Sequence, residues 1–411
     1  GGEAGTPGDG GAGAAGDATT PDGGQGGDGG DPGTAGDGGA GGAAGSGGSG
    51  GTAGSAGTDA TPVSAGGNGG AGGAGAAGVA GVGAPNAIIA TISAGTNARP
   101  RGVAVSPDGV YAYVTNTGRV LVIDTATNQV TATITVDGAN AVAVSPDGAR
   151  VYTANLGRLL GDVGTVSVID TFTNRVTATI EVGRQPKEVA VSPDGAYAYI
   201  TNFSSDTVSV LDTATNTITA TIGGFTNPQG VAVSSDGNQA YVTNGFGSTV
   251  SVIDTATNRV TATIGGFNSP KAVAVAPDGG YAYIANLNGT VSVLDTATNR
   301  VTATIGGFFQ PQGLAVSPDG SHVYVTNYDR QVGTVSVIDT DPTSSTYNTV
   351  TATITGIPPL PFGVAVSPVG TRVYVTNPFD VTVSVIDTAS GAGGAGGAGG
   401  AGGAGGASGG L

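Results

Sequence analysis

Carboxylate and amide groups recur at regular intervals through the middle of this 411-residue chain. An aspartate that ends a Val-Ile-Asp or Val-Leu-Asp segment and precedes threonine occurs seven times, at Asp124, Asp170, Asp212, Asp254, Asp295, Asp339 and Asp387. An asparagine that closes a Tyr-Val-Thr-Asn segment or a variant of it also occurs seven times, at Asn116, Asn155, Asn202, Asn244, Asn286, Asn327 and Asn377. Such groups could ligate a metal or exchange protons, but a functional site needs a set of residues that occurs once. We therefore interpret both series as hydrogen-bond partners of local turns.

The single histidine, His322, offers little further chemistry. The chain contains no cysteine, methionine or tryptophan. Disulfides, thiol catalysis and sites with several histidine or cysteine ligands are therefore excluded. No cysteine or cluster of carboxylates accompanies His322 in the sequence, and we expect its side chain to lie in solvent at the start of a strand. We predict no catalytic residue, no metal site and no cofactor.

The two ends of the chain differ sharply in composition from its middle. Residues 1–83 contain no Leu, Ile, Phe, Tyr, Lys or Arg, and the chain ends in repeated Gly-Gly-Ala triplets. Segments of this composition cannot bury enough apolar surface to offset the entropy of ordering their backbone. We expect 1–85 and 389–411 to be glycine-rich low-complexity segments, either disordered or forming polyglycine-II helices. Residues 86–388 then form one domain of about 300 residues.

Charge and targeting signals narrow the classes of partner. The net charge is −16, which argues against nucleic-acid binding because phosphate contacts need a basic surface. No apolar run is long enough to span a bilayer. Because the sequence lacks methionine, we expect a processed or partial chain whose export signal lies upstream.

An internal repeat predicts the fold. The motif Ser-Pro-Asp-Gly or a variant occurs seven times, and its third residue is Asp108, Asp147, Asp194, Asp236, Asp278, Asp319 or Val369. Each unit, such as residues 231–264, reads as four short runs rich in Val, Ile, Thr and Tyr that are separated by turn residues. Seven units of four antiparallel strands predict an all-β fold, a seven-bladed β-propeller.

The ends of the repeat region predict how the ring closes. The seventh unit, residues 363–388, stops after its third strand. Residues 86–92 stand alone before the first unit and resemble a fourth strand. We expect 86–92 to join 363–388 in one blade, which removes the free sheet edges that promote aggregation.

The repeated Tyr-Val-Thr-Asn segments, together with Ser-Pro-Asp-Gly and Val-Ser-Val-Ile-Asp-Thr, resemble the YVTN-type β-propeller repeat of bacterial and archaeal extracytoplasmic proteins. The glycine-rich ends resemble those of the mycobacterial PE-PGRS surface proteins, although the helical PE domain of that family is absent. These resemblances imply a propeller with an exported location, secreted or at the cell surface in the cell wall. They imply no single activity.

Loop variation separates two rims of the expected propeller. The Ser-Pro-Asp-Gly turns and most Asp-Thr-Ala-Thr-Asn turns are near-identical copies and form a uniform rim. The other two loop sets differ from unit to unit and form a variable rim, where arginine and phenylalanine have the composition of an interface. The candidate binding residues on this variable rim are Arg99, Arg101, Arg158, Arg184, Lys187, Gln229, Lys271, Gln312 and Arg330.

These observations favour a secreted or surface-exposed, non-catalytic binding or scaffold protein, and they leave open whether the chain is an enzyme. The partner would be a protein or a component of the cell envelope, and we expect a monomer. One alternative is a metal-assisted, lactonase-like hydrolase at the channel, where Lys187 and Glu188 form the only charged pair at the entrance of a first strand. A second alternative is single-stranded nucleic-acid binding through arginine and phenylalanine.

Overall fold

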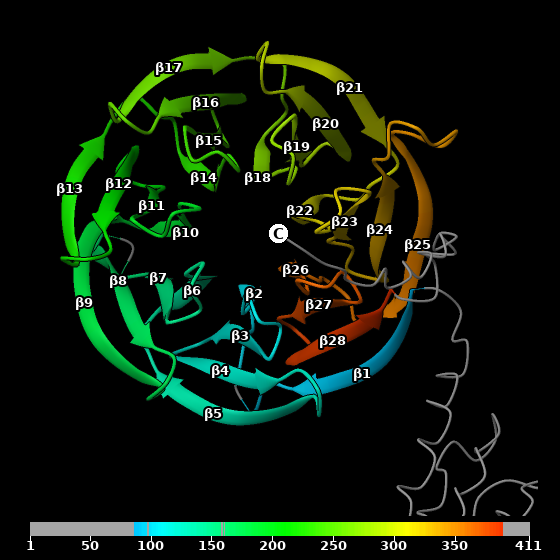
Figure 1. Ribbon diagram of the computed structural model, residues 1–411. Coiled ribbons are helices and arrows are strands. Elements are labelled where there is room, and N and C mark those ends of the chain that lie inside the picture. The colour runs from blue at the N-terminus through cyan, green and yellow to red at the C-terminus, as the bar shows by residue number, and fades with distance from the viewer. Residues whose placement is uncertain (1–85, 97, 158, 160, 389–411) are drawn as a thin grey trace, which may run out of the picture. The chain divides into compact units, whose positions relative to one another are not determined.

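Seven four-stranded antiparallel sheets form the propeller, as the sequence predicts. The computed structural model describes residues 86–96, 98–157, 159 and 161–388, and every regular element in these ranges is a β-strand. The sheets are arranged around one central channel (Figure 1). The two glycine-rich segments, with the disorder or polyglycine-II structure expected of them, lie outside the described residues. No helix in the described part of the chain is long and apolar enough to cross a membrane.

Each blade runs from an innermost strand at the channel to an outermost strand at the periphery. The innermost strands of blades 1 to 7 are β2 (Val103–Val105), β6 (Ala139–Val144), β10 (Pro186–Val191), β14 (Pro228–Val233), β18 (Pro270–Val275), β22 (Pro311–Val316) and β26 (Val364–Val366). The second strands are β3 (Tyr111–Asn116), β7 (Arg150–Asn155), β11 (Tyr197–Asn202), β15 (Gln239–Asn244), β19 (Tyr281–Asn286), β23 (His322–Asn327) and β27 (Arg372–Asn377). The third strands are β4 (Arg119–Asp124), β8 (Val163–Asp170), β12 (Thr207–Asp212), β16 (Thr249–Asp254), β20 (Thr290–Asp295), β24 (Gly333–Asp339) and β28 (Thr382–Asp387). The outermost strands are β5 (Gln129–Thr135), β9 (Arg175–Arg184), β13 (Thr217–Ile222), β17 (Arg259–Ile264), β21 (Arg300–Gly306), β25 (Thr349–Ile357) and, in blade 7, β1 (Ala87–Ser93).

The core lies between neighbouring blades. Second and third strands are buried on both faces, whereas the outermost strands alternate between exposed threonine and inward apolar residues. Tyr113 of blade 1 packs on Val142, Val151 and Ile169 of blade 2, and the equivalent tyrosines are buried in the same way. Burial of each such side chain contributes about 1.5–3 kcal/mol, so the repeated tyrosine joins one blade to the next.

The ring closes as the sequence predicts. β1 pairs with β28 in antiparallel register from Ala87 opposite Asp387 to Ser93 opposite Thr382 (Figure 1). Blade 7 therefore combines both ends of the repeat region. On the uniform rim, the guanidinium of Arg372 in this blade donates to the carbonyl of Thr125 in blade 1.

Both repeated turns use their aspartate as an acceptor, which confirms the structural interpretation of these residues. In blade 1, Asp108 Oδ1 accepts from Ser106 Oγ at 2.5 Å and from the Val110 amide at 3.0 Å, while Gly109 has φ of 74°. Asp124 Oδ1 accepts from the amide and the hydroxyl of Thr127 at 2.7 and 2.8 Å. These hydrogen bonds lower the pKa of both carboxyl groups.

Candidate functional site

One residue from each blade stands at the entrance of the channel on the variable rim. It directly follows the proline, or in blade 2 the alanine, that pairs with the asparagine at the end of the second strand. Blades 1 and 7 have the same arrangement, because Arg101 and Phe362 donate their amides to Thr115 and Thr376. We call these seven residues the mouth ring: Arg101, Asn140, Lys187, Gln229, Lys271, Gln312 and Phe362.

Threonines of the second strands fix the backbone of the mouth ring. The hydroxyl of Thr201 donates to the Gln229 carbonyl of the next blade at 2.6 Å, and Thr243 donates to Lys271 at 3.1 Å. The same contact joins Thr115 to Asn140, Thr326 to Phe362 and Thr376 to Arg101. Blades 2 and 5 differ, because Ala154 and Ala285 replace this threonine, and the Lys187 carbonyl accepts instead from the Asn140 side chain at 2.9 Å. The third letter of the Tyr-Val-Thr-Asn repeat thus positions the ring.

The residue that follows the mouth-ring residue in the sequence is glycine or alanine in six blades and glutamate in blade 3. A Cβ on Gly363 would lie 2.2 Å from the Arg101 carbonyl oxygen, and one on Gly313 would lie 2.6 Å from that of Phe362. Glycine is therefore required where the next blade approaches closely. Blade 3 places Glu188 at this position instead. Its amide donates to Thr201 Oγ1 at 3.1 Å, and its Oε1 accepts from the Val189 amide at 3.3 Å.

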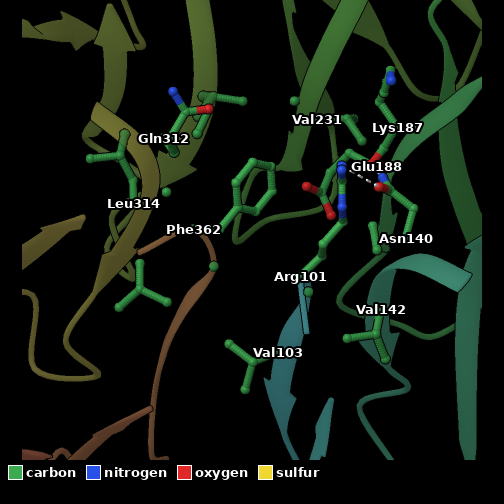
Figure 2. Close-up of a pocket in the computed structure, with 18 residues that line it drawn as sticks. Arg101, Val103, Asn140, Val142, Lys187, Glu188, Val231, Gln312, Leu314 and Phe362 are labelled. Carbon is green, nitrogen blue, oxygen red and sulfur yellow. Dashed lines mark hydrogen bonds between the residues drawn. The ribbon is translucent and has the colours of Figure 1, made fainter. Parts of the chain in front are cut away.

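A cavity of about 220 Å³ occupies the channel mouth. Its polar wall includes Arg101, Asn140, Lys187, Glu188 and Gln312, as Figure 2 shows. The apolar residues at its base come from six of the innermost strands and comprise Val103, Val142, Val231, Val273, Leu314 and Val364. The cavity is thus polar at the entrance and lined by branched apolar side chains below.

Three cationic side chains belong to the mouth ring, and neutral groups hold them. Arg101 Nη1 donates to Asn140 Oδ1 at 3.2 Å, and its guanidinium carbon lies 5.5 Å from the centre of the Phe362 ring. Lys187 Nζ lies 5.2 Å from the centre of the Phe203 ring. Lys271 Nζ donates to Gln229 Oε1 at 3.0 Å. Cation–π contacts and amide acceptors orient the charges without neutralising them.

The pKa values of these groups reflect loss of water and mutual repulsion. Burial, followed by the charges of Lys187 and Arg101, lowers the pKa of Lys271 to about 8. Burial and the charge of Arg101 also lower the pKa of Lys187, and burial lowers that of Arg101. Burial raises the pKa of Glu188 to about 7. The site therefore holds cations that a bound anion would stabilise.

The structure separates the nine candidate residues into two groups. It brings Arg101, Lys187, Gln229, Lys271 and Gln312 together in the mouth ring. Arg99 and Arg330 are exposed on loops of the variable rim, and Arg184 is exposed at the end of β9. Arg158 lies outside the described residues. Asn140 was not among the site residues predicted from the sequence, although alignment of the seven innermost strands places it in the ring.

The uniform rim holds His322 in a different environment from the one expected. A hollow of about 580 Å³ between blades 6 and 7 is lined by His322, Tyr324, Val337 and Val369. Ser321 Oγ donates to Asp319 Oδ2 at 2.8 Å and lies 2.7 Å from His322 Nδ1. Because the serine proton is directed to the carboxylate, the histidine donates to the serine and does not activate it as a nucleophile. Among the described residues, no group of three or more His, Cys, Asp or Glu could hold a metal ion.

Comparisons with known proteins find two similarities for the chain. Residues 115–234 match the family described as the cytochrome D1 heme domain. A solved structure titled "Kuenenia stuttgartiensis Hydrazine Synthase" is similar with a TM-score of 0.63 and 25% sequence identity. The match covers 72% of this chain and 97% of that chain. A search of curated proteins finds no match.

The residues described do not fit a heme held by this chain alone. Heme iron in proteins is held by histidine, cysteine, methionine or tyrosine, and none of these lines the channel mouth. His322, the only histidine, lines the hollow on the opposite rim, where no lysine or arginine is present among the lining residues to bind heme carboxylates. The iron ligand and the cationic groups are therefore on opposite rims.

The expectation of a non-catalytic binding or scaffold protein is wrong. One match carries the description of a heme domain and the other belongs to an enzyme. Neither match points to the hydrolase or nucleic-acid alternatives. The function was predicted wrongly because the residues that could reveal it are few and are distributed over seven blades. No local motif contains them.

Proposed function

We propose that this chain is the propeller module of a redox-type enzyme, and that it binds a small anionic substrate or product at the mouth ring. Oxyanions and small carboxylates are the ligand class that suits a cationic cavity of about 220 Å³, which is smaller than a typical pocket for a drug-sized ligand. Any metal or redox cofactor of the reaction would then belong to a partner subunit.

The observation that carries the proposal is that three cations, Arg101, Lys187 and Lys271, belong to one ring at the channel mouth. Their charges repel one another, and their recorded side-chain partners are amide oxygens and aromatic rings. Bringing three partly desolvated cations together costs free energy unless an anion completes the cluster. The similarity to the cytochrome D1 heme domain family and to a chain of hydrazine synthase supports placing this site in a redox protein.

Calorimetric titration with nitrite and with acetate tests the site. We expect one binding site per chain in the wild type. Arg101→Gln and Lys271→Met should each weaken binding roughly tenfold to a hundredfold, because a hydrogen bond to a charged group contributes about 1.5–3 kcal/mol. The anions should bind more weakly at high salt, since screening acts on the same charges.

Arg300→Gln is the matched control, because Arg300 is exposed at the start of β21 beside the uniform rim. Its removal changes the net charge equally but leaves the mouth ring intact. Equal loss of affinity in Arg300→Gln and Lys271→Met would contradict a localised site and indicate a nonspecific charge effect.

We also propose that the protein acts outside the cytoplasm, at the cell surface or in the cell wall. The resemblance to YVTN-type repeats and to the glycine-rich segments of PE-PGRS proteins supports this location. Labelling of intact cells with an antibody against the propeller tests it, and a signal that appears only after lysis would contradict it.

A further inference from the structure

We propose that Glu188 is the proton-exchanging group of the mouth ring, so that an anion bound there is accompanied by a proton on this carboxyl group. The inference rests on the proposed anion site. It adds the proton as a second reactant at that site. Reactions that reduce oxyanions consume protons, and a carboxyl group inside the anion cavity could hold one next to the ligand.

The position of Glu188 within the repeat carries the argument. The equivalent residues of the other six blades are glycine or alanine, and glycine is enforced at Gly313 and Gly363 by close approach of the next blade. Only blade 3 extends a long side chain from this position into the cavity, where Figure 2 shows its carboxyl group in the channel interior. Hydrogen bonds from its own strand neighbour and to Thr201 hold the residue in place.

The cationic groups of the mouth ring come from three of the seven blades. Arg101 precedes β2, Lys187 lies on β10 beside Glu188, and Lys271 lies on β18. The other four blades contribute neutral mouth-ring residues, namely Asn140, Gln229, Gln312 and Phe362. Glu188 is the only carboxylate among the residues that line the cavity. An incoming anion therefore meets a single like charge, and protonation of that one group removes the repulsion.

The pKa of Glu188 fits this role. Burial raises it to about 7, so the group is about half ionised at neutral pH. A bound anion opposes ionisation and raises the pKa further, which predicts uptake of about half a proton at pH 7. Lys271 has a pKa of about 8, lowered mainly by burial, and a bound anion also raises it. Its proton uptake is therefore centred near pH 8 and is separable from that of Glu188.

Carbon-13 NMR of glutamate-labelled protein tests the inference at one atom. The chain contains only three glutamates, Glu3, Glu181 and Glu188, so the carboxyl spectrum holds three signals. We expect one signal, absent in Glu188→Gln, to titrate near pH 7 and to move to higher pH when nitrite is added. The signal of the exposed Glu181 should not respond to nitrite.

Calorimetry gives the second readout. With wild-type protein at pH 7, nitrite binding measured in two buffers of different ionisation enthalpy should show uptake of about half a proton. In Glu188→Gln the uptake at pH 7 should fall close to zero while binding remains, and the control Glu181→Gln should match the wild type. The wild-type affinity should fall about tenfold between pH 6 and pH 8 through Glu188 alone.

The outcomes separate the inference from the proposed function. If Glu188→Gln binds nitrite with the same proton uptake and the same pH dependence as the wild type, the role of Glu188 is wrong and the anion site stands. If the wild type binds neither nitrite nor acetate at any pH between 6 and 8, the anion site and the role of Glu188 are both overturned.

Discussion

At the scale of single residues, the tyrosine, threonine and asparagine of the Tyr-Val-Thr-Asn repeat have distinct structural tasks. The tyrosine packs on the next blade, and the threonine hydroxyl donates to the mouth-ring carbonyl of that blade. The asparagine amide donates within its own blade, as from Asn244 Nδ2 to Ser251 Oγ at 2.9 Å. Its oxygen accepts from the incoming connection, as from the Thr226 amide at 3.2 Å. The sequence predicted a structural task for the asparagine, but nothing in one repeat reveals that the threonine partner lies in another.

The threonine contact predicts a difference between two buried threonines of the second strands. In Thr243→Val the Lys271 carbonyl loses its donor and the Gly230 amide loses its acceptor, which lies at 2.9 Å. We expect a loss of about 1–3 kcal/mol in the free energy of unfolding. Thr153 of blade 2 lies one position earlier in the repeat, where the other blades have valine or isoleucine, and it is buried with a hydroxyl that has no hydrogen-bond partner. Thr153→Val should therefore be neutral or stabilising. Urea unfolding of both variants measures the difference, and equal destabilisation would contradict this account of the contact.

At the scale of elements, strand pairing and turn chemistry agree throughout the propeller. Alternating runs of Val, Ile, Thr and Tyr predicted every blade, and the unpaired strand at 86–92 predicted the closure. The predictions succeeded because the same strand pattern and the same turn residues occur in each of the seven repeats. The hollow between blades 6 and 7 was not foreseen, because it depends on how Val369 and His322 of adjacent blades meet.

The turn of blade 7 offers a test of these local rules. Val369 occupies the place of the turn aspartate and is 76% exposed, while Gly370 keeps φ of 73° and the Arg372 amide still donates to Ser367 Oγ. Val369→Asp supplies the acceptor that Ser367 lacks. We expect stabilisation of about 0.5–1.5 kcal/mol at pH 7.

Acidification provides the check on Val369→Asp. Hydrogen bonds to the ionised form lower the pKa of the equivalent carboxyl groups, Asp108 and Asp147, so their stabilisation is present at neutral pH and is lost as pH falls through the lowered pKa. The gain in Val369→Asp should disappear in the same way below about pH 4. A gain in thermal stability that persists at pH 2.5 would contradict an ionised turn acceptor.

At the scale of the whole molecule, seven near-identical blades produce one asymmetric site. The geometry of the ring follows from the repeat. The ligand class depends instead on the seven mouth-ring residues, which in blade order are Arg, Asn, Lys, Gln, Lys, Gln and Phe. The sequence argument assigned five of them to a broad rim and could not distinguish them from exposed residues such as Arg99 and Arg330. Only the closed ring shows which of the variable residues face the channel.

The cations and His322 lie on opposite rims, and this separation predicts how the protein responds to added heme. Titration with hemin should give no stoichiometric complex with the absorption spectrum of a histidine-ligated heme. Any weak spectral change should be equal in the wild type and in Arg101→Gln. A stoichiometric complex that Arg101→Gln or Lys271→Met abolishes would contradict the fit of the channel mouth to small anions.

The most direct measurement of the central claim is a crystal structure of the protein grown with bromide, which anomalous scattering locates without ambiguity. The account predicts one well-occupied bromide ion among Arg101, Lys187 and Lys271 at the channel mouth, and its loss in Lys271→Met crystals. Bromide confined to exposed arginines of the outer loops, with none at the channel mouth, would contradict it.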